Sequence, residues 1–64
     1  MSPYPLVDRI RAEFIEMPGL QLTVAQAARL FGTELSLCRD AIDTLIASAF
    51  LRRTRTGLVA RAAN

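Results

Sequence analysis

The sequence predicts a small α+β fold that is mainly helical, with three helices and a small antiparallel sheet. Apolar residues recur at helical spacing in three segments, and a glycine separates the second segment from the third. A basic stretch with its own glycine then has the pattern of a β-hairpin. The chain has 64 residues, which suits one domain over residues 1–64, and its apolar share of 52% excludes a disordered chain.

The first helix is predicted over residues 5–17. Pro5 suits the first turn, where its missing N–H costs no hydrogen bond. Arg9 and Glu13 are four residues apart and are expected to pair on the exposed side. The predicted apolar face consists of Leu6, Ile10, Phe14 and Met17. Pro18 and Gly19 end the helix.

A short strand is predicted over residues 20–22, followed by the second helix over residues 24–31. Thr23 and Gln26 have the spacing of a capping box, in which each side chain accepts a hydrogen bond from the other residue's backbone N–H. Gly32 is expected to end the helix in the left-handed conformation. The predicted buried side consists of Val24, Ala27, Ala28 and Phe31.

The third helix is predicted over residues 34–49 and the hairpin over residues 50–61. Gly57 is expected at the hairpin turn with a positive φ. The core-facing side of the helix is predicted to hold Leu35, Cys38, Ala41, Ile42, Leu45 and Ala49. The opposite side is predicted to hold Ser36, Arg39, Asp40, Asp43 and Ala47.

Charge is unevenly distributed along the chain. Residues 1–43 carry a net charge of −2 and residues 44–64 carry +4, because the last acid is Asp43. Every cation is an arginine, a side chain that can bind phosphate through two hydrogen bonds. In strand alternation Arg53 and Arg55 would share one face of the hairpin and Arg52 the other. These three arginines are either phosphate contacts or charges that keep an exposed strand edge from pairing with another chain.

The chain from about Pro5 to Arg61 resembles the winged helix-turn-helix domain of bacterial transcription regulators, most clearly over residues 30–51. The residues that carry the resemblance are Leu30-Phe31-Gly32-Thr33, Ala41-Ile42, Leu45, and Ala49-Phe50-Leu51 leading into Arg52-Arg53. Ala49 stands where glycine is common in that family. The resemblance implies that residues 35–48 form a recognition helix, that residues 50–61 form the wing, and that the protein is a dimer bound to double-stranded DNA. The DNA-binding residues that it implies are Ser36, Arg39, Arg52, Arg53 and Arg55.

A second interpretation is a winged-helix module that binds proteins and does not bind DNA. Glu34, Asp40 and Asp43 favour it, because carboxylates on the side that faces phosphate are repelled. Leu35, Leu37 and Ile46 are covered either by the first helix and the hairpin or by a partner, which includes a second copy of the chain. Tyr4, Leu6 and Val7 are the other candidates for a partner surface.

The sequence gives little support for catalysis, a cofactor or a metal. Histidine is absent, and the single cysteine, Cys38, lies among apolar neighbours and is expected to be buried. Asp40 and Asp43 are interpreted as solvated surface carboxylates and not as an acid pair. No apolar run is long enough to cross a membrane and the first residues lack the pattern of a signal peptide, so a cytoplasmic protein is expected.

Overall fold

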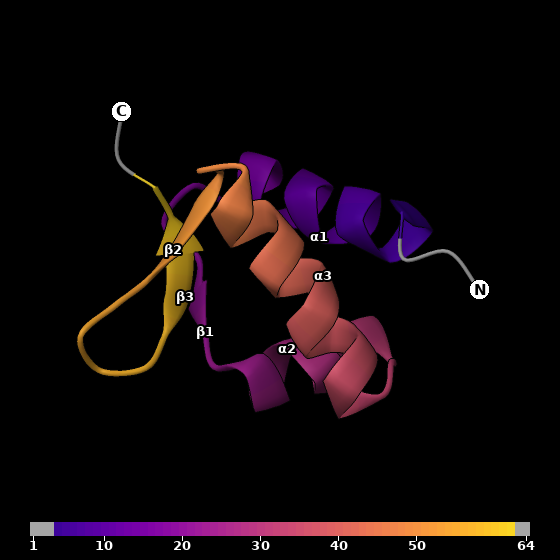
Figure 1. Ribbon diagram of the computed structural model, residues 1–64. Helices are drawn as coiled ribbons and strands as arrows, with labels where there is room; N and C mark the ends of the chain where they lie inside the picture. Colours follow the sequence, from indigo (N-terminus) through magenta and orange to yellow (C-terminus); the bar gives the residue numbers. More distant parts are fainter. Residues whose placement is uncertain (1–3, 63–64) are drawn as a thin grey trace.

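The computed structural model describes residues 4–62, with the side chains of residues 5–62. These residues form three helices and a three-stranded antiparallel sheet, an α+β fold that is mainly helical (Figure 1). The elements in chain order are α1 (Tyr4–Glu16), β1 (Gln21–Leu22), α2 (Val24–Phe31), α3 (Leu35–Ala47), β2 (Leu51–Arg53) and β3 (Val59–Arg61).

Helix α1 packs through Val7, Ile10 and Phe14, which are at most 2% exposed. Their spacing of three and four residues makes one helical face. The predicted face was therefore wrong at both ends: Leu6 is only half-buried, and Met17 lies beyond the last helical residue and is 45% exposed. Val7 is a core residue and cannot belong to a partner surface, while the side chain of Tyr4 lies outside the described residues.

The predicted ion pair between Arg9 and Glu13 does not form among the described residues. Instead the Arg9 guanidinium donates to the backbone carbonyl of Phe31 at 3.4 Å, and its Cζ lies 5.6 Å from the centre of the Phe31 ring. Arg11 takes the local ion pair, with Asp8 at 3.2 Å. Packing of α1 against the end of α2 therefore offers Arg9 a partner that helical spacing within α1 could not predict.

Helix α2 has the two ends that the sequence predicts. Thr23 Oγ1 accepts from the Gln26 backbone N–H at 3.0 Å, and Gln26 Oε1 accepts from the Thr23 N–H at 2.9 Å. At the other end Gly32 has φ +62°, and the Thr33 N–H reaches back to the Ala28 carbonyl at 3.0 Å. Ala27, Ala28 and Phe31 are buried as predicted, whereas Val24 is half-buried.

Helix α3 supplies four fully buried residues, Cys38, Ala41, Ile42 and Leu45. The prediction that Leu35 and Ala49 lie on the core-facing side of this helix was wrong. Leu35 is the first helical residue and is 44% exposed, because it lies beyond the edge of the core. Ala49 is outside the helix, which ends at Ala47, because Ala49 takes the left-handed conformation at φ +65°.

The sheet has the strand order β1-β3-β2, so the last of the three described strands lies between the other two. Gln21 pairs with Ala60 on one side of β3, and Arg52 pairs with Ala60 on the other. The turn between β2 and β3 contains Gly57 at φ +85°, as predicted, and its N–H donates to the Thr54 carbonyl at 3.1 Å. Antiparallel pairing thus joins the segment between α1 and α2 to the hairpin.

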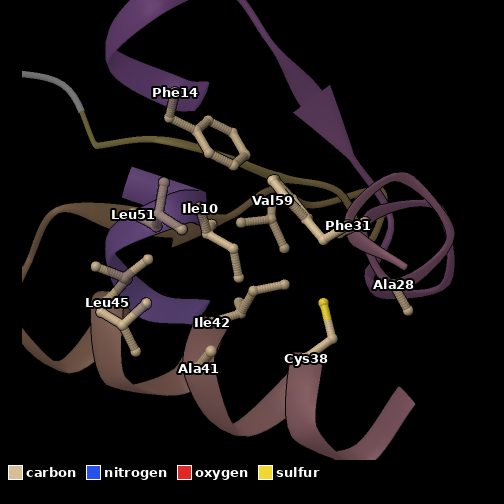
Figure 2. Close-up of a cluster of buried hydrophobic side chains, with 12 residues drawn as sticks. Ile10, Phe14, Ala28, Phe31, Cys38, Ala41, Ile42, Leu45, Leu51 and Val59 are labelled. Carbon is tan, nitrogen blue, oxygen red and sulfur yellow. The ribbon is translucent and has the colours of Figure 1, made fainter. Parts of the chain in front are cut away.

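The core lies where the three helices meet one face of the sheet. Figure 2 shows side chains from α1, α2 and α3 converging on Leu51 of β2 and Val59 of β3. Cys38 is fully buried among them, as predicted, and burial raises the pKa of its thiol above the ordinary value of 9.0. A neutral thiol in this position acts as a small apolar side chain.

Candidate nucleic-acid interface

The polar side of α3 is exposed, as its periodicity predicts. The exposed polar residues on this helix are Ser36, Arg39, Asp40, Asp43 and Thr44. The three hairpin arginines that were predicted to bind DNA, Arg52, Arg53 and Arg55, are exposed as well. All five predicted DNA-binding residues are therefore accessible to solvent, and two of them, Ser36 and Arg53, bond to acidic side chains.

Ser36 is engaged within its own helix turn. Its hydroxyl donates to a carboxylate oxygen of Glu34, the residue at the N-terminal cap of α3. The Glu34 side chain makes no capping hydrogen bond to the helix backbone. The N-terminus of α3, where a helix favours negative charge, therefore already has a carboxylate beside it.

Arg53 of β2 forms an ion pair with Asp43 of α3. The distance from Arg53 Nη2 to Asp43 Oδ1 is 3.0 Å, and the two side chains are 46% and 55% exposed. The sequence did not predict this contact, because its formation depends on how the segment after α3 turns the chain into β2. The only signal was the opposite charge of two exposed residues ten positions apart.

The three hairpin arginines do not share one face. Arg53 lies opposite the fully buried Val59 in the pairing of β2 and β3, and Arg52 lies opposite Ala60, so the two arginines alternate across the sheet. Arg55 lies in the turn and outside both strands, so strand alternation does not determine which side of the hairpin it occupies. Arg53 is the one of the three whose contact with α3 the structure establishes.

Arg61 is the fourth cation of the basic segment and packs against an aromatic ring. Its Cζ lies 4.4 Å from the centre of the Phe50 ring, and Arg11 approaches the same ring at 5.7 Å. The Nε of Arg61 is buried without a hydrogen-bond partner among residues 4–62. Stacking on the Phe50 ring gives Arg61 a structural role. The sequence alone shows Arg61 only as one of the basic residues of the hairpin segment.

Large apolar side chains are also exposed on α2 and α3. Leu30 near the end of α2 is 54% exposed, and Leu35 and Leu37 in the first turn of α3 are each 44% exposed. Ile46, by contrast, is half-buried and packs against the core. Of the three α3 residues for which the sequence left open either burial within the fold or a partner surface, Ile46 packs against the core and Leu35 and Leu37 are exposed.

The fold and this exposed surface define a small three-helix protein with a β-hairpin next to its third helix. No family model, curated protein or solved structure matched the chain. Within residues 4–62 no helix is long and apolar enough to cross a membrane. In the same part of the chain, no three histidine, cysteine or acidic side chains are grouped closely enough to hold a metal ion.

Proposed function

We propose that this protein is a small winged helix-turn-helix DNA-binding protein that regulates transcription as a dimer, with α3 as the recognition helix and the β2–β3 hairpin as the wing. Helix α3 presents Ser36 and Arg39 to the DNA, and Arg52, Arg53 and Arg55 contact phosphates. Double-stranded DNA is the partner, and neither a metal nor a cofactor takes part.

The order of the elements supports this assignment. A helix and a short strand precede two helices joined at Gly32, and a hairpin follows whose second strand also pairs with the first short strand. A tight glycine turn between two helices is typical of a helix-turn-helix. The hairpin loop projects away from the helices, as a wing does (Figure 1).

The observation that carries the proposal is the contact between Arg53 and Asp43. It joins the hairpin to the polar side of α3 at 3.0 Å. The recognition helix and at least one wing arginine therefore border one continuous surface, which also includes the exposed Arg39. Arginines beside a groove-sized helix suit phosphate contact, which supplies most of the sequence-independent affinity of DNA-binding proteins.

The expected affinity is modest and strongly dependent on salt. With three or four phosphate contacts, counterion release gives a slope of about −0.9 per contact in a plot of log affinity against log salt. Between about 50 and 200 mM salt, the affinity should fall by about 40- to 150-fold. Fluorescence anisotropy of a labelled duplex of mixed sequence measures this directly.

The variant R52A/R53A/R55A tests the wing contacts. Only Arg39 would remain, so the fall in affinity over the same salt range should shrink to about 3.5-fold. A12E/I15E is the charge control, because it lowers the net charge at two exposed positions of α1. Unchanged DNA affinity in the triple variant would contradict the proposed wing contacts, and flat traces for the unmodified protein would contradict DNA binding itself.

The three exposed leucines favour a second candidate function, a protein-interaction module that does not bind DNA. Leu35 and Leu37 place apolar surface on the helix that the first candidate assigns to DNA, and Leu30 exposes more apolar surface near the end of α2. This candidate predicts no duplex binding at 50 mM salt together with self-association or partner binding that L35E/L37E abolishes. Sedimentation velocity over a range of protein concentrations tests the self-association.

A further inference from the structure

We infer that Asp43 limits DNA affinity by holding Arg53 against α3, so that a phosphate must displace the Asp43 carboxylate to reach this wing arginine. This inference rests on the proposed function and adds a residue that restrains it. The Asp43 carboxylate and the DNA phosphate are competing anions for one guanidinium.

The geometry of the pair supports competition. Arg53 Nη2 lies 3.0 Å from Asp43 Oδ1, which is within hydrogen-bonding distance, so this donor is occupied in the free protein. Both side chains are about half exposed, at 46% and 55%, so a phosphate from solvent can approach the guanidinium. Neither group is locked in the core, and the pair can open without disturbing the fold.

The other exposed cations of the proposed interface differ from Arg53. Within residues 4–62 the ion pairs are Arg11–Asp8 and Arg53–Asp43, so Arg39, Arg52 and Arg55 have no carboxylate partner there. Arg53 is thus the arginine of this surface whose charge is masked before DNA arrives. Exposed ion pairs are weak, so opening this one should reduce affinity by about two- to fivefold.

Asp40 offers a matched control for Asp43. The two aspartates are three residues apart on α3, so they lie on the same side of the helix, and both are exposed. Asp40 has no ion-pair partner in the described part of the chain. D40N and D43N each remove one negative charge from this side, and only D43N also frees a cation.

The test compares these two variants by anisotropy with a labelled duplex of mixed sequence at about 50 mM salt. Both should bind more tightly than the unmodified protein, and D43N should bind about two- to fivefold more tightly than D40N. In the R53A background the two substitutions should become equivalent. The difference should also shrink at about 200 mM salt, because salt screens the exposed pair.

Two results would overturn the inference while leaving DNA binding intact. D43N could bind no better than D40N, or its advantage could persist in the R53A background. Absence of salt-dependent binding in every variant would instead reject the proposed function, and the inference with it. Circular dichroism melts check folding, and D40A with D43A replaces the asparagine pair if either asparagine variant is unfolded at the assay temperature.

Discussion

Helices α2 and α3 end in the same way, yet different residues occupy the left-handed position. Gly32 has φ +62° after α2, and Ala49 has φ +65° after α3. In both places the next N–H reaches back five residues to a helix carbonyl, from Thr33 to Ala28 and from Phe50 to Leu45. Glycine adopts this backbone freely, whereas an alanine there is strained by its Cβ.

The N-terminus of α2 is also better capped than the N-terminus of α3. Thr23 caps α2 within a capping box, while Glu34 at the start of α3 makes no capping bond with its side chain. The eight-residue α2 buries three residues and has a cap at both ends, whereas the thirteen-residue α3 buries four side chains completely and has no side-chain cap at its start. Short helices need favourable ends, whereas a helix that crosses the core tolerates poor ones.

The largest expected effect comes from the packing that holds α3. I42A removes a side chain that is fully buried and should lower the free energy of unfolding by about 2–5 kcal/mol, enough to unfold much of so small a domain. L37A, on the same helix but 44% exposed, should change stability by less than about 0.5 kcal/mol. Chemical denaturation checks both variants, and equal losses would contradict the division between buried and exposed faces.

G32A should lower the stability of α2 by about 1 kcal/mol, because alanine disfavours a positive φ. An added Cβ would meet no atom within 4 Å, so the loss measures backbone conformation alone. G19A is the control, since its added Cβ is equally free and its φ is not positive. A thermal melt should show G32A several degrees lower, with G19A unchanged or slightly higher.

A49G should raise the free energy of unfolding by up to about 1 kcal/mol, by relieving the strain at the end of α3. A47G changes the last residue of the helix itself and should have the opposite sign, because glycine disfavours a helical backbone. Denaturant titration of the two variants gives the sign directly. A loss of stability in A49G would mean that the alanine side chain contributes more than its backbone costs.

The smallest effect is expected at the start of α3, where E34T should stabilise the protein by about 0.5 kcal/mol. Threonine can accept a hydrogen bond from the helix backbone, as Thr23 does for α2. E34A separates this gain from the mere loss of the acid. Both variants also lose the contact with Ser36, so thermal melts of the pair should differ only through the new cap.

Features that depend only on residues close together in the sequence could be predicted from it. The capping box at Thr23 and the left-handed turn at Gly32 each follow from side-chain chemistry within a few residues. The ends of the apolar faces could not be fixed in this way. Val7 was missed and Met17 wrongly included, because helical periodicity does not show where a helix leaves the core.

The candidate interface was predictable as a set of exposed residues but not as a set of contacts. Periodicity places Ser36 and Arg39 on the outer side of α3, and both are exposed. The pairing of Arg53 with Asp43 depends on the direction in which the chain leaves α3, which Ala49 sets through its unusual backbone. An alanine rarely adopts that conformation, so the residue type alone does not predict it.

The place of β3 at the centre of the sheet has a consequence for how the chain folds as it is synthesised. Both β1 and β2 have β3 as their neighbour, and β3 is the last of these three strands to be made. While its residues are still inside the ribosome, neither earlier strand has a partner, and Val59 cannot yet fill the core. Helices can form on the emerging chain, but the sheet assembles only after translation has passed residue 61 and β3 has left the exit tunnel.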